Sequence, residues 1–322
     1  ASTYGNAMGT FSWKHKFSDN LNTNLSVFYS DCKFNLQIPF QKFEWDSKIT
    51  NYGLKYNWNQ TISDNFKLNY GIDGLYYDFN PGTIQPYGTG SQFNYNQLDK
   101  KYALETSAYL DVEQQVTEKL NLRYGLRYSM FNRLGNENIS TYQNGQAVVY
   151  NPLYHIYEEG TPTGSKYYGK GKTISNFNNF EPRLALSYAF NDETSVKASY
   201  NKMAQYIHML SNTRAPLPMT IWTPSGPFTK PQMLDQYAAG YFKNFMESEY
   251  SFEGELFYKK IKNRIDYIDG ASLLGNNNIE QDILNGKARS YGMELLFRKN
   301  TGRFTGWVSY TLSKAEQKTP GR

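Results

Sequence analysis

The residue types most often used in catalysis are few and dispersed in this 322-residue sequence. Its three histidines, His15, His155 and His208, lie far apart, and no HExxH, GxSxG or P-loop motif occurs. The glycine-rich run YYGKGK at 167–172 lacks the following helical pattern that a phosphate-binding loop requires, which favours a surface loop. We therefore expect no enzymatic activity, no catalytic residue and no cofactor.

Acidic residues supply one candidate for metal binding. Asp266 and Asp269, together with Glu280 and Asp282, fall in one long connection and could ligate calcium there. Their spacing matches no EF-hand, and a solvated loop explains them equally well. The single cysteine, Cys32, allows neither an internal disulfide nor a thiolate metal cluster. The sequence assigns no metal ligand, and calcium binding by this loop stays open.

Aromatic and basic side chains in two long connections form the candidate ligand-binding set. The connections cover 133–178 and 206–235 and flank the strand pair at 179–205, so their bases must lie near each other. Aromatic faces with a few charges can hold a siderophore, a sugar or a peptide, although any single tyrosine could instead pack within its loop. The candidates are Tyr154, His155, Tyr157, Tyr206, His208, Arg214 and Trp222.

Composition limits the classes of protein. The chain is 39 % hydrophobic and 20 % charged, has a mean hydropathy of -0.70, and contains no apolar run of the roughly 20 residues that a membrane helix needs. Membrane strands remain compatible with these values because only alternate residues of such a strand face lipid. Lys and Arg are dispersed despite a net charge of +5, so nucleic-acid binding is not indicated.

The stretch LNLRYGLRYSMF at 120–131 alternates apolar and polar residues with the period of a β-strand. The same alternation follows six short polar turns near 18–20, 63–65, 117–119, 191–194, 247–249 and 300–303. It predicts about twelve strands, near 9–17, 21–34, 48–60, 66–78, 101–115, 120–132, 179–190, 195–205, 236–245, 250–262, 288–298 and 304–314. Long connections near 35–47, 79–100, 133–178, 206–235 and 263–287 alternate with the short turns, so each kind occupies one end of a single sheet.

Three features favour lipid over a protein core as the partner of the apolar face. Most predicted strands have ten or more residues, which suits tilted membrane strands. Short turns at one end and long loops at the other are typical of outer-membrane barrels, and aromatic residues such as Trp58 and Tyr188 gather at strand ends. We predict an all-β transmembrane antiparallel β-barrel in which Leu122, Tyr124, Leu126 and Tyr128 point outward and Arg123 and Arg127 inward. A soluble carbohydrate-binding β-protein is the alternative.

Four segments resemble the TonB-dependent outer-membrane receptors, especially those of the Bacteroidota: PRLALSYAF, KPQMLDQYAAGYF, GKARSYGMELLFRK and GWVSYTLSKAE. The resemblance covers nearly the whole chain. It implies a barrel of 22 strands, an N-terminal plug and a TonB box that contacts an inner-membrane energy-coupling complex. The plug, the box and the closing C-terminal strands are not visible in this sequence. We therefore expect residues 1–322 to form an arc of a larger barrel, whose first and last strands do not pair with each other.

The resemblance implies uptake of a scarce bulky nutrient of the siderophore, oligosaccharide, cobalamin or peptide class across the bacterial outer membrane. The expected partners are outer-membrane lipid, the nutrient, the TonB complex through a segment outside this chain, and a surface lipoprotein. A structural or adhesive barrel, or a passive pore, is the alternative from another functional class. A plug domain and TonB box upstream of Ala1 would support uptake, whereas strands alone would favour the alternative.

The choice between lipid and core can be tested on the chain itself. A strand face built for lipid has no protein surface to cover it in water, so the chain should aggregate when refolded without detergent. The measurement is the soluble fraction after dilution from denaturant, with and without detergent micelles. A soluble, monodisperse product in plain buffer would favour the carbohydrate-binding alternative.

Overall fold

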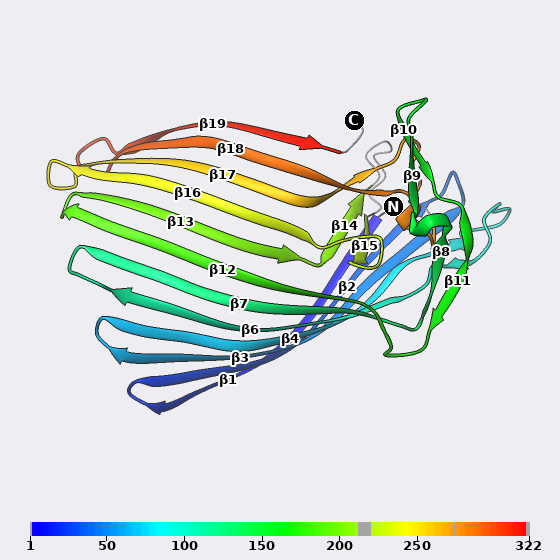
Figure 1. The fold of residues 1–322 in the computed structure, drawn as a ribbon, viewed down its shortest axis with the longest axis horizontal. Helices are drawn as coiled ribbons and strands as arrows, with labels where there is room; N and C mark the ends of the chain where they lie inside the picture. The colour runs from blue at the N-terminus through cyan, green and yellow to red at the C-terminus, as the bar shows by residue number, and fades with distance from the viewer. Residues whose placement is uncertain (1, 212–219, 274, 320–322) are drawn as a thin grey trace.

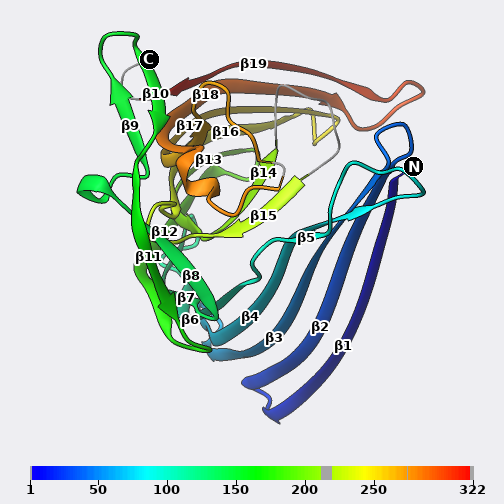
Figure 2. The same cartoon turned by 90° about the vertical axis from the view of Figure 1, so that its right-hand side faces the viewer.

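A computed structural model describes residues 2–211, 220–273 and 275–319, and its main feature is one curved antiparallel sheet of 13 strands. Twelve strands follow each other in sequence order across the sheet (Figures 1 and 2). They are β1 (Ser2–Ser18), β2 (Leu21–Ile38), β3 (Phe43–Ser63), β4 (Phe66–Pro86), β6 (Lys101–Gln115), β7 (Leu120–Leu134), β12 (Thr173–Asn191), β13 (Thr194–Gln205), β16 (Gln232–Phe245), β17 (Tyr250–Tyr267), β18 (Ile283–Lys299) and β19 (Gly306–Lys318). The short β5 (Asn96–Gln97) pairs with β4. The prediction of an all-β antiparallel fold is confirmed.

Each of the twelve strands overlaps a strand that the sequence predicts, but most extend further toward the long connections. The five long connections therefore shrink to 39–42, 87–100, 135–172, 206–231 and 268–282. The reason is that backbone pairing continues where the alternation of side chains has ended. In β4, for example, Thr83 and Gln85 still pair with β3 although the apolar pattern stops near Asp78. Hydrogen bonding between strands requires no apolar face, so the hydrophobic period underestimates strand length there.

The pairing register separates an outward face from an inward one. Leu126 of β7 stands directly opposite Leu110 of β6 and Pro182 of β12, and all three share the convex face. On the concave face, Arg123 pairs with Asp111 at 2.6 Å and Arg127 with Asp73 at 2.9 Å. The predicted orientation of these arginines is confirmed. Because an apolar convex face and a charged concave face match lipid and a wet lumen, the sheet has the polarity of a membrane barrel.

Aromatic side chains border the outward apolar band at both of its ends. Near the long connections, Tyr200, Tyr237, Tyr258 and Tyr291 stand opposite one another on β13, β16, β17 and β18. At the short-turn end, the rings of Trp58 and Tyr70 stack with centroids 5.6 Å apart. Two such rows are the aromatic girdles that mark the boundaries of the hydrocarbon layer.

The hydrophobic core lies inside the curve at the long-connection end and not along the middle of the sheet. Phe43 and Trp45 of β3 pack there with Leu210 and Ile221, which belong to the connection between β13 and β16. None of the described helices, each a single 3-10 turn, is long and apolar enough to cross a membrane. Packing at this end of the sheet thus fixes the connections that form its mouth.

The first and last strands form the two edges of the sheet. Among the described residues, β1 pairs with β2 alone and β19 with β18 alone, and the two edge strands do not pair with each other. Figure 2 shows the resulting open curve, with β1 and β19 on its two sides. The prediction that these strands do not close on each other is confirmed.

The orientation of β7 gives a stability test. Leu126→Arg places a charge in the middle of the apolar band and should reduce the free energy of unfolding by about 2–4 kcal/mol. Asn121→Arg adds the same side chain on the concave face of the same strand and should change stability by less than about 1 kcal/mol. Denaturant titration of the protein folded in lipid vesicles measures both. Equal destabilisation by the two variants would contradict the assigned faces.

Candidate functional site

The candidate residues lie at the long-connection end, where hairpins cover the mouth of the curved sheet. One hairpin, β14 (Ile207–Ser211) with β15 (Thr220–Pro224), lies inside the curve (Figures 1 and 2). Two further hairpins, β9 (Val148–Asn151) with β10 (Ile156–Glu159) and β8 (Glu137–Tyr142) with β11 (Pro162–Tyr168), project beyond it. The short turns η1 (Gln143–Gly145) and η2 (Ile279–Gln281) complete this region.

Tyr206 joins the inward hairpin to the wall. Its ring lies parallel to that of Phe131 in β7, with an interplanar angle of 2° and centroids 4.8 Å apart. Its hydroxyl lies 2.6 Å from the Ser129 hydroxyl and accepts a hydrogen bond from the Asn179 amide at 2.7 Å. The side chain is 3 % exposed. Tyr206 is therefore an anchor of the hairpin, and its ring does not face the open mouth.

His208 is a buried titratable group of the inward hairpin. Its Nε2 lies 2.8 Å from the Ser225 hydroxyl, and its Nδ1 lies 3.3 Å from the Gln232 amide nitrogen. Burial, with a smaller contribution from the positive charge of Arg264, lowers the pKa of His208 to about 4. The imidazole is neutral near pH 7 and is satisfied by its neighbours. It has the properties of a structural histidine in this conformation.

Trp222 and a buried ionic cluster lie against the same stretch of wall. The Trp222 side chain is half-buried beside the cluster formed by Phe79, Ala103, Phe131 and Tyr206. Next to it, the Lys101 ammonium lies 3.4 Å from the Thr223 hydroxyl of β15. Arg133 donates to both carboxylate oxygens of Glu137, at 2.6 and 2.8 Å. Sequence reasoning missed this ionic cluster, although Lys101 and Arg133 occupy inward positions of their strands.

Tyr154, His155 and Tyr157 belong to the projecting β9–β10 hairpin. Tyr154 is 66 % exposed, and His155, also exposed, has a positive φ of 52° at the tip. The Tyr150 hydroxyl lies 3.0 Å from Nδ1 of His155, and the Tyr150 ring packs on Tyr157 with centroids 5.1 Å apart. Tyr157 also borders a cavity of about 260 Å³, which Phe228 and Glu280 line from other connections. This hairpin presents the aromatic surface of the mouth.

The structure thus divides the predicted set into two groups. Tyr206, His208 and Trp222 lie on or beside the inward β14–β15 hairpin, whereas Tyr154, His155 and Tyr157 lie on the projecting β9–β10 hairpin; Figure 2 shows the two hairpins. Arg214 lies outside the described residues. The pattern of aromatic residues in the sequence predicted members of both groups. It did not indicate that one group is buried and the other exposed.

The acidic connection at 268–282 is organised by its own hydrogen bonds. The Asp282 carboxylate is 2 % exposed and accepts a hydrogen bond from the Asn276 amide at 2.7 Å, while burial raises the pKa of Asp282. Glu280 accepts a hydrogen bond from the Tyr142 hydroxyl at 2.9 Å. No group of three metal-binding side chains occurs among residues 2–211, 220–273 and 275–319. These contacts hold Glu280 and Asp282 within the structure of the connection.

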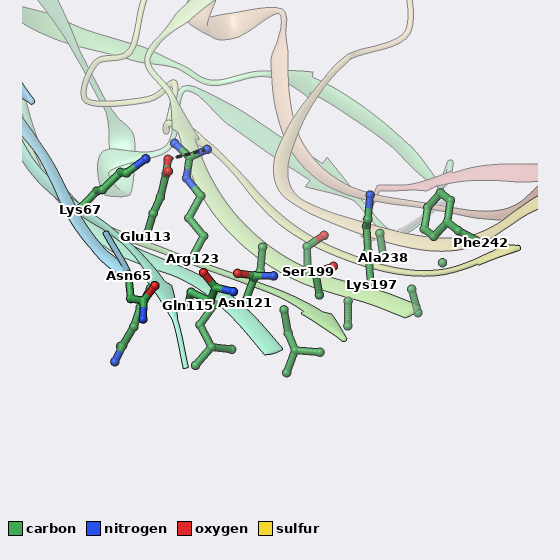
Figure 3. A pocket seen from close by; sticks show the side chains of 18 of the residues that line it. Asn65, Lys67, Glu113, Gln115, Asn121, Arg123, Lys197, Ser199, Ala238 and Phe242 are labelled. Atoms are coloured by element: carbon green, nitrogen blue, oxygen red, sulfur yellow. Dashed lines mark ion pairs between the residues drawn. The ribbon is translucent and has the colours of Figure 1, made fainter. Parts of the chain in front are cut away.

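An open concavity of about 580 Å³ lies on the inner wall, near the short turns. Figure 3 shows that its labelled side chains are mainly polar, among them Lys67, Glu113, Arg123 and Lys197. The Arg123 guanidinium lies 3.6 Å from the Glu113 carboxylate. The inner wall is therefore suited to water or to a polar protein surface.

A lipid-facing apolar band, two aromatic girdles and a polar inner wall define the wall of an outer-membrane barrel. The family model described as "TonB dependent receptor-like, beta-barrel" matches residues 1–322. The chain belongs to this family and is a protein of the bacterial outer membrane. No curated protein matches the sequence.

Solved receptors share the fold at low sequence identity. The FrpB iron transporter from Neisseria meningitidis (F3-3 variant) superposes with a TM-score of 0.62 at 14 % identity, covering 98 % of this chain and 44 % of its own. The alcaligin outer membrane receptor FauA from Bordetella pertussis superposes with a TM-score of 0.59 at 16 % identity, and the match covers 98 % of this chain and 47 % of FauA. The Serratia marcescens hemophore receptor HasR, solved with its hemophore HasA and heme, superposes with a TM-score of 0.66 at 15 % identity, and the match covers 97 % of this chain and 49 % of HasR. The chain spans just under half the length of each.

The buried His208 makes the inward hairpin sensitive to acid. Because its pKa is about 4 when folded and about 6.5 in an exposed chain, the hairpin is stable above about pH 6.5 and loses stability as the pH falls toward 4, by roughly 3 kcal/mol in total. Hydrogen exchange of β14 and β15 amides at pH 7.5 and 5 measures this loss.

His208→Gln should weaken this pH dependence, and His155→Gln is the control because it changes an exposed histidine of the other hairpin. An acid response that is the same in wild type and in His208→Gln would show that another group causes it.

Proposed function

We propose that this chain forms part of the barrel wall of an energy-coupled receptor that takes up a scarce, bulky nutrient across the outer membrane. The observation that carries the proposal is the mouth, where the hydrogen-bonded strands β14 and β15 lie inside the curve and a second hairpin presents aromatic side chains. A mouth narrowed by ordered chain suits selective capture better than free diffusion, because ordered aromatic side chains lose little entropy on binding.

In this proposal the two groups of mouth residues have different tasks. Tyr154, His155 and Tyr157 contact the nutrient first, since they lie on the projecting hairpin beside the 260 Å³ cavity. Tyr206, His208 and Trp222 hold the inward hairpin, and Arg214 is a further candidate contact in the same connection. The nutrient class remains that of siderophores, oligosaccharides, cobalamins or peptides. The projecting hairpins are also the surface that a lipoprotein partner would cover.

Energy coupling requires protein outside this chain. We propose that the polar inner concavity receives a plug domain of the same receptor, and that a TonB box on that receptor contacts the energy-coupling complex. Lys67 and Lys197 give the concavity exposed cations that can pair with acidic groups of a plug, whereas Arg123 already pairs with Asp111. The experiment is uptake of labelled candidate nutrients by cells with and without TonB. Uptake that continues without TonB would indicate a passive pore.

The mouth residues can be tested by binding to the intact receptor. Tyr154→Ala should weaken nutrient binding about 10-fold, because an aromatic anchor commonly contributes at least 1–2 kcal/mol to such a surface. Trp222→Ala should weaken it indirectly, because Trp222 packs beside the cluster that holds the inward hairpin. His208→Ala should weaken it by loosening the hairpin. Tyr167→Ala is the matched control, since Tyr167 is 61 % exposed but lies on the neighbouring β11. If all three test variants bind as tightly as wild type, the binding surface lies elsewhere in the receptor.

A further inference from the structure

The cavity of about 260 Å³ at the mouth brings together residues from three long connections that are far apart in the sequence. Ala147 and Tyr157 line it from the connection that carries the projecting hairpins, Phe228 from the connection before β16, and Glu280 from η2. The other lining residues are Val148, Ile283, Leu284, Asn285 and Thr319. We call it the rim cavity. Mainly apolar and aromatic walls with a few polar groups are typical of a ligand-binding pocket.

Glu280 is the one side chain with a full charge near pH 7 that lines the rim cavity within the described part of the chain. Its Oε1 atom accepts a hydrogen bond from the Tyr142 hydroxyl at 2.9 Å. Its Oε2 atom has no hydrogen-bond donor among residues 2–211, 220–273 and 275–319. The Glu280 side chain is half-buried. A carboxylate oxygen that is partly shielded from water and unused by the fold can bind a donor, and it binds a charged donor most strongly.

The charges around Glu280 favour a cation as that donor. Burial raises the pKa of Asp282, and the negative charges of Glu159 and Glu280 raise it further, so three carboxylates act on one another here. Lys101 approaches Glu280 from the wall, but its ammonium lies 3.4 Å from the neutral Thr223 hydroxyl and forms no ion pair with the described residues. A further positive charge beside Glu280 would therefore reduce the repulsion among the carboxylates.

The neutral polar side chains of the rim cavity are used by the fold. The Asn285 amide donates a hydrogen bond to the Phe228 carbonyl oxygen at 3.0 Å, and its oxygen accepts one from the Lys230 backbone N–H at 3.2 Å. The Thr319 hydroxyl donates to the Asp266 carboxylate. A sugar needs many such partners, and a cobalamin is larger than this cavity, which lies below the roughly 300–1,000 Å³ of pockets for drug-sized ligands. Oligosaccharides and cobalamins therefore match the rim cavity poorly.

The aromatic walls of the rim cavity are held in place by other rings. Phe228 packs edge-to-face on Tyr142 with centroids 5.2 Å apart, and Tyr157 packs on Tyr150 with centroids 5.1 Å apart. Ordered rings lose little entropy on binding, and their faces attract cations. The metal-binding oxygens of a siderophore are negatively charged, and Glu280 would repel them. The ligand that matches these walls has a positive charge next to an apolar group.

We propose that the rim cavity binds the amino terminus of a short peptide, with Glu280 accepting a hydrogen bond from the α-ammonium group and the apolar wall enclosing the first side chain. An amino terminus fits because its charge and its first side chain are joined to the same carbon atom. The inference rests on the proposed function, because it selects the peptide class for the nutrient that enters this mouth. Since Tyr157 belongs to the projecting hairpin, the rest of the peptide can extend toward Tyr154 and His155.

The test measures peptide binding by the purified receptor that carries this barrel, using isothermal titration calorimetry. The probes are Leu-Gly-Gly-Gly and the same peptide with an acetylated amino terminus, which has no positive charge. Glu280→Gln removes the charge but keeps an acceptor for Tyr142, and Val148→Phe fills part of the cavity. Glu158→Gln is the matched control, because Glu158 is an exposed carboxylate of the same hairpin that does not line the cavity. Heat-modified electrophoretic mobility verifies that each variant is folded.

Wild type and Glu158→Gln should bind the free peptide, and acetylation should weaken this binding about 10- to 100-fold, the usual range for a hydrogen bond to a charged group. Glu280→Gln should weaken binding of the free peptide by a similar factor and leave that of the acetylated peptide unchanged. Val148→Phe should weaken binding of both peptides. Equal binding of the two peptides by wild type, or an equal loss in Glu158→Gln, would overturn the inference.

Uptake by cells separates this inference from the proposed function. TonB-dependent uptake of a nutrient that is not a peptide, with no preference of the receptor for a free amino terminus, would overturn the peptide assignment and leave energy-coupled uptake intact. Peptide uptake that continues without TonB would overturn energy coupling and leave the rim cavity as the site of the amino terminus.

Discussion

The structure depends on one constraint, which is that every backbone N–H and C=O group inside hydrocarbon must be hydrogen-bonded within the protein. The chain meets it with an unbroken antiparallel ladder from β1 to β19, in which sequence neighbours are also neighbours in space. Short turns join the strands at one end because an antiparallel pair needs only a few residues to reverse direction. The two edges, β1 and β19, are the places where the constraint must be met by further strands when the wall lies in lipid.

Because the ladder fixes the backbone, side chains on its two faces are free to serve different surroundings. The convex face carries the apolar band, whereas the concave face carries charges that are paired across strands, as Arg127 is with Asp73. A charge in a wet lumen is readily tolerated, and pairing positions it for contact with a second protein surface. At the mouth, the same wall supplies Phe131, Ser129 and Asn179, which hold Tyr206 and with it the inward hairpin. Rigidity of the mouth therefore originates in the strands beneath it.

The alternation of residues in the sequence was sufficient to predict the strands and the orientation of their side chains, because one face must be apolar and the period is two. It could not predict where β4 ends at Pro86, since pairing outlasts the apolar pattern. It also could not predict that His208 is buried. That burial depends on Ser225 and Gln232, which lie 17 and 24 residues away and leave no periodic signal. The ionic contact between Arg133 and Glu137 also escaped prediction although only four residues separate them, because it depends on how the chain turns between β7 and β8 and forms no chemical motif.

The pairing of charged side chains differs between the inside of the mouth and the convex face of the sheet. Inside the mouth Arg133 pairs with Glu137, and Glu280 accepts a hydrogen bond from Tyr142, whereas the buried Lys101 has the neutral Thr223 hydroxyl at 3.4 Å. On the convex face Lys262, Lys287 and Lys318 stand opposite one another without an ion pair in the described part of the chain, and water can surround them because all three are exposed. Charges that the fold itself does not use are thus found where a barrel meets the polar layer of its membrane.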